Sequence, residues 1–287
     1  MFKEIIAIDV HERVPQFVER LKPFVSEKIN IFASSDEAFK STKQYPSVDA
    51  VVISIYQTIT QEQLRTLPAL SHIFILGTSL KKIPLEYCHE HNIAVSNITG
   101  YCDHETAEWV IMQALKYFRE RDLPQSAFQK TLGVVGVGAV GSIVAHLGLA
   151  LGMNVLYHSP KPHAELSQKG AQYADLSDLF AACDIISAHT PPQAVWLKFE
   201  HLQKAKADFL FINTCMGRVD YHDDLSRALA KRPDITLVLD SIALSNYPDL
   251  TARAHVIEYP AFKTIDSEKR LVDKLFGNIK KATQQLS

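Results

Sequence analysis

The chain has 287 residues, of which 47% are hydrophobic and 22% charged, and a formal net charge of −2. This composition is that of an ordinary globular protein, and the length accommodates two domains. A net charge so close to zero, without any basic run, argues against a nucleic acid or an anionic membrane as partner. No uninterrupted apolar run in the sequence is long enough to span a bilayer.

The four cysteines, Cys88, Cys102, Cys183 and Cys215, are scattered without C-x-x-C spacing. This scatter suits reduced thiols in the cytoplasm better than a disulfide framework or a zinc site. The N-terminal sequence MFKEIIAIDV lacks the basic start and the long apolar stretch of a signal peptide. We therefore expect a cytoplasmic protein without a metal site.

Short apolar runs alternate with amphipathic stretches through the first third of the chain. The pattern predicts strands over 4–8, 30–33, 50–55, 72–76 and 93–96, and helices over 14–21, 36–43, 61–66 and 84–91. Pro84 suits the first turn of the last of these helices, since its missing N–H is not needed there. Such β/α alternation predicts a parallel sheet, and hence an α/β layer fold.

A longer helix is predicted over 104–121, after a break that contains Gly100. Asp103 is expected to be its N-cap, and Arg119 and Arg121 lie near its negative C-terminal end. Apolar residues recur at helical spacing at Ala107, Val110, Ile111, Ala114, Leu115 and Phe118. A long helix placed between two β/α series is suited to connect two domains.

A second β/α series follows this helix. Its expected strands are 132–137, 154–157, 184–188, 209–213, 236–239 and 255–258. Its expected helices are 139–151, 176–182, 197–206, 221–231 and 267–285.

The second series opens with the sequence TLGVVGVGAVG, residues 131–141. It predicts a strand, a tight G-x-G-x-x-G turn and the start of a helix, which is the pattern of a dinucleotide site. Gly136 allows the sharp turn, Gly138 allows the backbone to approach a pyrophosphate, and Gly141 allows close packing of helix and strand. The helix N-terminus offers free N–H groups to the phosphates.

Four further segments are more specific than the glycine turn. They are the pair Ala107–Glu108, the segment DIISAHTP at 184–191, the segment FINTCMGRVDYHDDL at 211–225 and the pair Leu239–Asp240. With these segments the chain resembles the D-isomer-specific 2-hydroxyacid dehydrogenases over most of its length.

This resemblance implies a two-domain α/β protein. Residues 99–263 would form a Rossmann-type dinucleotide-binding domain, and residues 1–98, joined by a returning helix at 264–287, a smaller flavodoxin-like substrate domain. The resemblance implies that NAD or NADP exchanges hydride with a 2-oxo or 2-hydroxy acid in the cleft between the domains. It also implies a homodimer formed through the helix at 104–121.

The resemblance assigns thirteen residues to the cofactor: Gly136, Gly138, Ala139, Val140, Gly141, Ser159, Lys161, His189, Thr190, Pro191, Thr214, Cys215 and Asp240. Ser159 stands where the family often carries the Asp that binds the ribose 2′-hydroxyl. A serine does not repel a 2′-phosphate, and Lys161 could attract one, so the sequence favours NADP over NAD. The alternative is that Lys161 is a solvated loop lysine and that NAD binds without the acid.

Three side chains carry the family's chemistry: an arginine that pairs with the substrate, a histidine that exchanges a proton, and a glutamate that orients the histidine. The matching positions hold Met216, Ala261 and Ser245, respectively. Arg218 and Lys263 are candidates to replace the missing groups. The alternative for both is an ordinary surface residue.

Substrate contacts are expected in the loop GTSL, residues 77–80, which resembles the family's carboxylate-binding loop. That loop works through backbone N–H groups, so Thr78 and Ser79 are candidate anion binders. Tyr101 and His104, at the start of the long helix, are expected to face the cleft, where Tyr101 could bind a substrate oxygen.

Three hypotheses for the function remain. The first is an NAD(P)-dependent oxidoreductase with a non-standard active site. The second is a dinucleotide-binding protein that has lost hydride transfer and acts as a sensor or interaction partner. The third is an enzyme of another class with the same nucleotide domain.

Overall fold

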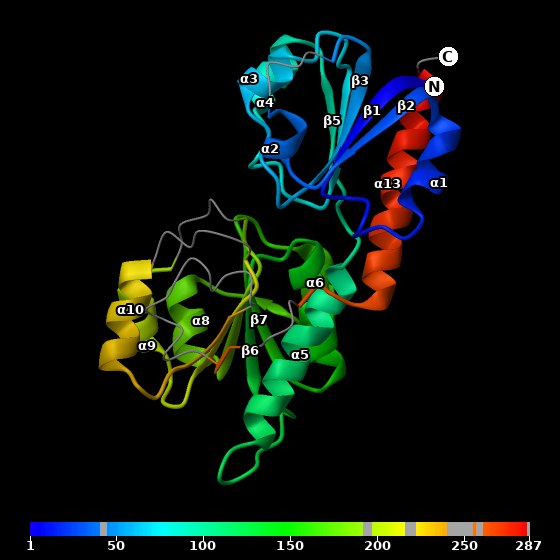
Figure 1. Ribbon diagram of the computed structural model, residues 1–287. Coiled ribbons are helices and arrows are strands. Elements are labelled where there is room, and N and C mark those ends of the chain that lie inside the picture. The colour runs from blue at the N-terminus through cyan, green and yellow to red at the C-terminus, as the bar shows by residue number, and fades with distance from the viewer. Residues whose placement is uncertain (41–44, 192–196, 216–221, 240–254, 257–260, 286–287) are drawn as a thin grey trace. The chain divides into compact units, whose positions relative to one another are not determined.

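The computed structural model describes residues 1–40, 45–191, 197–215, 222–239, 255–256 and 261–285 (Figure 1). The chain divides into two compact units: unit 1 is Met1–Tyr101 with Ile265–Ser287, and unit 2 is Cys102–Thr264. In the described parts of the chain, no helix combines the length and the apolar character that a membrane crossing requires.

Unit 1 is built on a five-stranded parallel sheet. Its strands are β1 (Phe2–Ile8), β2 (Val25–Phe32), β3 (Val48–Ser54), β4 (His72–Leu76) and β5 (Ala94–Ser96). Their order across the sheet is β2-β1-β3-β4-β5, which is the flavodoxin-like order. The fold expected for the first third of the chain is therefore confirmed.

Helices cover both faces of this sheet. They are α1 (Phe17–Leu21), α2 (Ser35–Ala38), α3 (Gln61–Arg65), α4 (Leu85–Glu90), α13 (Ile265–Gln285) and a 3₁₀ turn at Lys22–Phe24. On one face, alternate residues of β1 such as Ile6 pack with Leu64 of α3 and Tyr87 of α4. On the other, α13 packs on β4, and its Phe276 lies 6.1 Å from Phe17 of α1 between ring centroids (Figure 1). The last helix of the chain thus completes the core of unit 1.

Unit 2 is built on a seven-stranded parallel sheet. Its strands are β6 (Thr131–Val135), β7 (Asn154–His158), β8 (Gln172–Tyr173), β9 (Ile185–Ala188), β10 (Leu210–Asn213), β11 (Thr236–Leu239) and β12 (His255–Val256). The order is β12-β11-β10-β9-β6-β7-β8. The chain starts in the middle at β6, runs to one edge, and returns to the other side of β6 at β9. This is the Rossmann order, with its topological switch point between β6 and β9.

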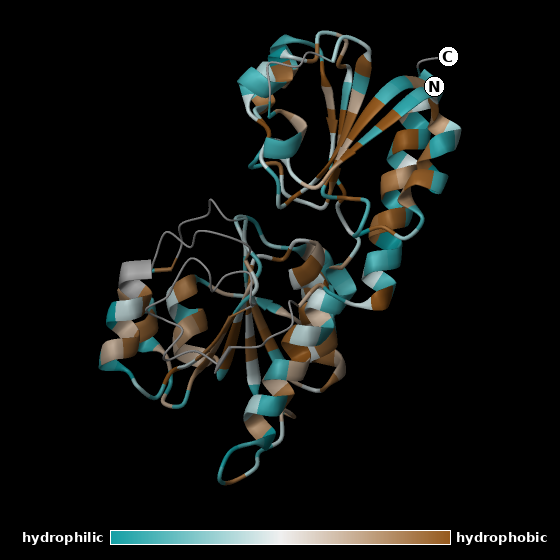
Figure 2. Cartoon of the chain, in the orientation of Figure 1, coloured by the Kyte–Doolittle hydropathy of each residue, from teal (hydrophilic) through white to brown (hydrophobic). Residues whose placement is uncertain are grey.

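Three described helices lie on each face of this second sheet. They are α5 (Asp103–Arg119), α6 (Ala139–Ala150) and α7 (Ala164–Gln168) on one face, and α8 (Leu176–Ala182), α9 (Phe199–Lys204) and α10 (His222–Lys231) on the other. Val134 packs among residues of the first group, whereas Val135, the next residue, packs among residues of the second. Hydrophobic residues accordingly follow the strands and the inner faces of the helices (Figure 2).

The structure differs from the sequence prediction at a few positions. The short elements α7 and β8 were not predicted. Asp103 is the first residue of α5 and not its N-cap; Cys102 holds the N-cap position without a side-chain capping bond. Asp103 nevertheless lies in the first turn, where a carboxylate favours the positive end of the helix. Pro84 stands one position before α4, at its N-cap.

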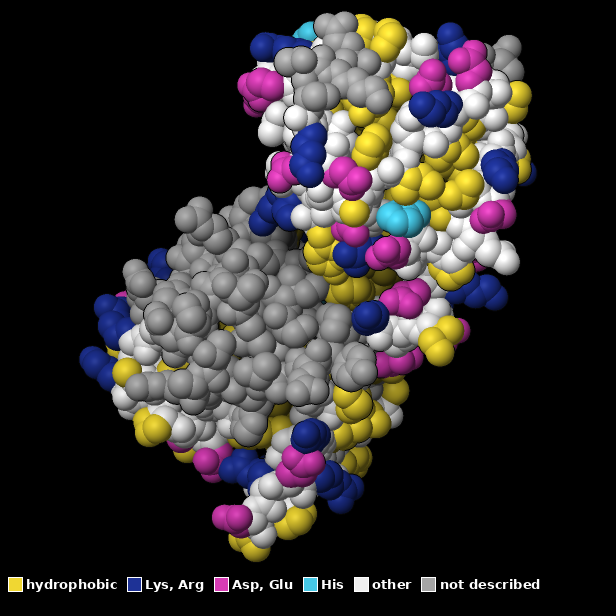
Figure 3. Space-filling view, viewed as in Figure 1, with side chains coloured by type: hydrophobic (Ala, Val, Ile, Leu, Met, Phe, Trp, Pro, Cys, Tyr) yellow, Lys and Arg dark blue, Asp and Glu magenta, His cyan; other side chains and the backbone are white. Residues whose placement is uncertain are grey.

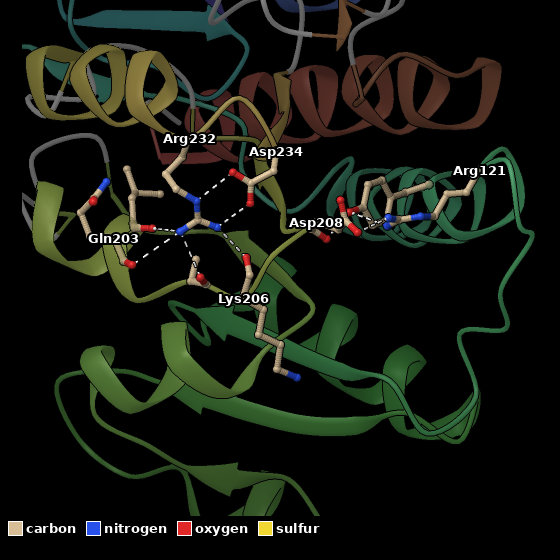
Figure 4. A network of polar contacts seen from close by, with 9 residues as sticks. Arg121, Gln203, Lys206, Asp208, Arg232 and Asp234 are labelled. Carbon is tan, nitrogen blue, oxygen red and sulfur yellow. Dashed lines mark hydrogen bonds and ion pairs between the residues drawn. The ribbon is translucent and has the colours of Figure 1, made fainter.

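One polar network joins the loops at the amino-terminal ends of β10 and β11 (Figure 4). The Arg232 guanidinium pairs with Asp234 at 2.6 Å and donates to backbone carbonyls at the end of α9 and just beyond, those of Leu202, Gln203, Ala205 and Lys206. Nearby, Arg121 pairs with the Asp208 carboxylate at 2.8 Å. The guanidinium thus ties the chain before β11 to the C-terminal end of α9, where the last carbonyls of a helix lack intrahelical donors; the Leu202 carbonyl also accepts the Ala205 N–H.

On the face of the molecule shown in Figure 3, basic and acidic side chains are interspersed. That distribution agrees with the net charge of −2 and with the absence of basic runs in the sequence.

Candidate functional site

The candidate dinucleotide site lies at the switch point of unit 2. Val135 at the end of β6 pairs with Ala188 at the end of β9, and the His189 N–H donates to the Val135 carbonyl at 2.8 Å. The glycine turn after β6 and the DIISAHTP segment therefore leave the sheet side by side. Open α/β sheets bind their ligands at this position, outside the carboxyl ends of the strands.

Two glycines of the turn are required by the chain itself. Gly136 has a φ of 87°, and a Cβ on it would lie 2.7 Å from the His189 carbonyl oxygen. A Cβ on Gly141 would lie 1.9 Å from the Gly136 carbonyl oxygen. Any side chain at either position would collide with backbone, so these glycines set the close approach of turn, helix and strand.

Gly138 differs from the other two glycines. A Cβ on it would meet nothing within 4 Å, and its φ of −73° is open to any residue. The chain's own packing thus leaves an open space over an exposed glycine. The open space and the N-cap position, where glycine is well tolerated, are both compatible with a ligand that approaches the backbone closely.

The space over Gly138 opens onto the N-terminus of α6. Ala139, Val140 and Gly141 form the first turn of this helix, whose backbone N–H groups have no intrahelical acceptor. The first turn carries no acidic residue, and the helix dipole adds partial positive charge. N–H groups, dipole and open space together fit a pyrophosphate, so the residues present fit a bound dinucleotide.

His189 borders the turn as a neutral, fixed imidazole. Its Nε2 lies 2.8 Å from the Ser187 hydroxyl and its Nδ1 3.0 Å from the Thr214 hydroxyl. Burial lowers the pKa of His189 to about 3. At neutral pH the ring therefore has one donor and one acceptor nitrogen, both engaged, and it holds β9 to the chain after β10 instead of exchanging a proton.

The residues after β10 close this edge of the site. The side-chain oxygen of Asn213, a fully buried residue, accepts the Cys215 N–H at 2.9 Å, which turns the chain as it leaves the strand. The Thr190 hydroxyl lies 3.6 Å from the Cys215 sulfur, and burial raises the pKa of that thiol. The sequence pattern does not predict that Asn213 shapes this turn, because the hydrogen bond depends on how the chain bends after β10. Pro191, the next residue after Thr190, is exposed.

The loop that would meet the adenosine ribose follows β7. The Ser159 hydroxyl, buried, donates to the Lys161 carbonyl, and the Tyr157 hydroxyl accepts the His163 N–H at 2.8 Å. These bonds hold the loop in one shape with the Lys161 side chain exposed. The segment from His158 to His163 contains no carboxylate.

A second candidate site lies in unit 1, in the loop after β4. Gly77 has a φ of 138°, which directs the loop away from the strand, and its carbonyl accepts the Ile98 N–H at 2.8 Å. The Thr78 hydroxyl donates to the Ile98 carbonyl at 3.1 Å. Among the described residues, no hydrogen-bond acceptor is recorded for the backbone N–H groups of Thr78, Ser79 or Leu80. The loop thus has the donors that an anion such as a carboxylate requires.

Tyr101 and His104 lie close in sequence but in different settings. The Tyr101 residue is 6% exposed, and its carbonyl accepts a hydrogen bond from Arg270 at 2.9 Å. His104 is exposed on the first turn of α5.

Of the three positions that the resemblance matches to the family's catalytic side chains, one is described. Ala261 is 4% exposed and belongs to the apolar cluster that contains Val134 and Val238. The position assigned to the histidine thus contributes to the hydrophobic core. Lys263, two residues on, is exposed. The remaining predicted positions, Met216, Arg218, Asp240 and Ser245, lie outside the described residues.

The family model for the NAD-binding domain of D-isomer specific 2-hydroxyacid dehydrogenases matches residues 103–260, more than half of the chain. The chain is 27% identical to a glyoxylate reductase of Aeropyrum pernix, over 78% of this chain and 76% of that protein. It is 26% identical to a 2-hydroxyacid dehydrogenase homolog of Zymomonas mobilis, over 65% of this chain and 63% of that protein, which is less than two thirds of its length.

Among solved structures, the fold is similar to the D-lactate dehydrogenase of Aquifex aeolicus in complex with NAD and lactic acid. The TM-score is 0.81 and the identity 24%, with 98% of this chain and 96% of that chain covered. This likeness shows the two-domain fold, and the family model is that of an NAD-binding domain over residues that include the glycine turn. The chain therefore belongs to the D-isomer specific 2-hydroxyacid dehydrogenase family of oxidoreductases.

Proposed function

We propose that this chain transfers hydride between NAD(H) and a small 2-oxo or 2-hydroxy acid. The observation that carries the proposal is the glycine turn after β6, where Gly138 is exposed, a Cβ on it would meet no atom within 4 Å, and the first N–H groups of α6 have no intrahelical acceptor. Bound NADH would supply the hydride, and NAD would accept it in the reverse reaction. The N–H groups of the α6 first turn would bind the cofactor's pyrophosphate, and Gly136 and His189 would shape the turn that receives it.

Unit 1 would bind the substrate. The N–H groups of Thr78, Ser79 and Leu80 suit a carboxylate, which all 2-oxo acids carry. The glyoxylate reductase relative favours small acids such as glyoxylate or pyruvate as first substrates to test. Tyr101 is a candidate for a further substrate contact.

The proton of the reaction has to come from a group other than the usual histidine. His189 is neutral and engaged through both ring nitrogens, and Ala261 has no ionisable group. Lys263 and Arg218 are the side chains proposed to compensate for the missing groups, and solvent is the alternative proton source. Slow turnover follows from a site of this kind, because positioned acid–base groups contribute about 10²- to 10⁴-fold to such rates.

The preference for NADP over NAD stays a prediction, and we propose that the site also accepts NADPH. The Ser159 hydroxyl is committed to the Lys161 carbonyl, and the loop from His158 to His163 contains no carboxylate to repel a 2′-phosphate. The exposed Lys161 amine can attract that phosphate.

A homodimer through the α5 face is also proposed. A groove is lined by Ile111, Met112, Leu115 and Leu147, together with Glu108, Lys116, Arg119 and Glu120. Met112 is 54% exposed and Leu115 36% exposed, so a second copy would cover apolar surface here. The cytoplasm is the proposed location, since all four cysteines are free thiols.

The burial of Ala261 in the core favours a second candidate function. Without an acid at this position the chain would bind dinucleotide and act as a sensor or interaction partner. One experiment separates the two functions: NADH oxidation at 340 nm with glyoxylate or pyruvate, beside an NADH fluorescence titration. Turnover supports the oxidoreductase, whereas binding without turnover supports the second candidate.

A further inference from the structure

Three side chains of α13 hold the backbone of the segment that leaves β5. Arg270, Lys274 and Asn278 stand at intervals of four residues and so share one face of the helix. Each donates a hydrogen bond to a backbone carbonyl. Arg270 Nε donates to Tyr101 at 2.9 Å, and Lys274 Nζ donates to Thr99 at 2.8 Å. Asn278 Nδ2 donates to Asn97 at 3.3 Å. We call this set the α13 clamp.

The spacing of the clamp matches two kinds of backbone. Four helical residues advance about 6 Å along the axis, and two residues of an extended chain advance about 6.6 Å. This spacing fits the Asn97 and Thr99 carbonyls, which an antiparallel helix can meet with two side chains four residues apart. Gly100 has a φ of 65°, a left-handed conformation that glycine adopts readily, and it lies between the last two carbonyls of the series.

The same segment also holds the candidate anion loop. The clamp binds the residues on both sides of Ile98. The Ile98 N–H donates to the Gly77 carbonyl at 2.8 Å, and the Ile98 carbonyl accepts from the Thr78 hydroxyl at 3.1 Å. The Asn97 side chain donates to the Thr78 carbonyl at 2.6 Å. Carbonyls of odd-numbered residues thus bind α13, and Ile98 binds the loop, so the segment connects the two.

We propose that Arg270, Lys274 and Asn278 are positioning residues, which fix the anion-binding N–H groups of the loop at 77–80 through the segment 97–101. The inference rests on the proposed function for its consequence in catalysis, but its structural part stands on the hydrogen bonds alone. All partners belong to unit 1. Loss of the clamp weakens substrate binding and leaves cofactor binding in unit 2 unchanged.

The test uses Lys274→Met, which keeps the length of the side chain and removes its donor. Lys280→Met is the matched control, since the Lys280 amine is exposed and, in the part of the chain that the structure describes, makes no hydrogen bond or ion pair. Lys274→Arg restores a donor. Asn278→Ala is the second variant, because it removes a different bond of the clamp if Lys274→Met folds poorly.

Two readouts are measured on the full chain. Hydrogen exchange is expected to rise about tenfold in peptides covering both 97–101 and 77–80 in Lys274→Met, and to stay unchanged in Lys280→Met. The KM for glyoxylate or pyruvate is expected to rise about tenfold with the Kd for NADH unchanged, and Lys274→Arg is expected to restore it.

Faster exchange at 97–101 without any change at 77–80 would overturn the coupling. A raised KM without any change in exchange would also overturn it, because Lys274 would then act on the substrate directly. If the wild-type chain reduces neither acid, the proposed function fails, while the exchange data still decide whether the clamp positions the loop.

Discussion

The carbonyl oxygen of His189 lies 2.7 Å from the point where a Cβ on Gly136 would stand. Two segments that are more than fifty residues apart in the sequence therefore meet backbone to backbone at the switch point of the sheet. This contact, and not the ligand, requires a glycine at position 136. Gly136 and Gly141 are therefore required by the packing of the chain, whereas a Cβ on Gly138 would meet no atom within 4 Å.

Gly136→Ala is expected to destabilise the protein by about 2 kcal/mol or more, since it combines a positive φ with a backbone collision. Urea unfolding measures the change. The control is Gly277→Ala in α13, where a Cβ also meets nothing within 4 Å and alanine favours the helix. Equal stability of the Gly136→Ala variant and the wild type would contradict the close approach of the two segments.

The burial of His189 predicts a specific pH dependence of stability. Its pKa is about 3 in the folded chain, against an ordinary value of 6.5. Between these values the unfolded chain binds more protons, so the folded state loses stability as the pH falls below 6.5, by at most about 1.4 kcal/mol per pH unit. Above pH 6.5 His189 is neutral in both states, so its titration no longer lowers the free energy of unfolding.

His189→Gln removes the titrating group and is expected to flatten this slope, although the variant is less stable at pH 7. Urea unfolding of both proteins at pH 7.0, 6.0 and 5.0 gives the comparison. Parallel slopes would show that His189 is not held neutral by burial.

Ser159→Asp tests which side chain sets cofactor choice. A carboxylate at the end of β7 would bind a ribose 2′-hydroxyl and repel a 2′-phosphate. The ratio of kcat/KM for NADH over NADPH is expected to rise about tenfold or more, which is about 1.4 kcal/mol of discrimination. Ser159→Ala removes only the hydroxyl and serves as the control. An unchanged ratio in Ser159→Asp would remove this position from the account of specificity.

The proposed dimer is tested by Met112→Glu combined with Leu115→Glu. Two charges in an apolar interface are costly to bury, so the variant is expected to be monomeric by light scattering, at half the mass of the wild type. Leu85→Glu in α4, a residue 42% exposed in unit 1, is the control. A variant that keeps the wild-type mass would place the interface elsewhere, and a monomeric wild type would reject the dimer.

Most of the fold could be predicted from sequence because its central strands, such as β3, β9 and β10, are buried apolar runs bounded by polar turns. The helix α5 was predicted to within two residues at each end for a similar reason, its apolar stripe. The elements α7 and β8 could not be predicted, since both strand residues are exposed and the helix spans only five residues. The local sequence pattern is the same whether Asp103 is the N-cap of the helix or its first residue, so the pattern could not decide between the two.

The site was predictable only where backbone conformation dictates the residue type. Gly136 and Gly141 follow from the turn, and the structure supplies the reason for each. The engagement of both His189 nitrogens depends on Ser187 and on Thr214, which follows β10, and a contact between segments distant in sequence is not encoded in a local motif. The α13 clamp joins residues about 170 to 180 apart in sequence, so no spacing pattern could reveal it.

The most direct test of the central claim compares the wild-type chain with Gly138→Val in one assay of NADH binding and NADH-dependent reduction of glyoxylate and pyruvate. Because a Cβ at position 138 meets no atom of the chain within 4 Å, the variant is expected to fold, with a loss of at most about 1 kcal/mol for the poorer N-cap residue. It should lose at least about a hundredfold in NADH affinity, as the valine fills the space for the pyrophosphate. A stable Gly138→Val variant that binds NADH as tightly as the wild type would contradict the assignment of this turn as the dinucleotide site.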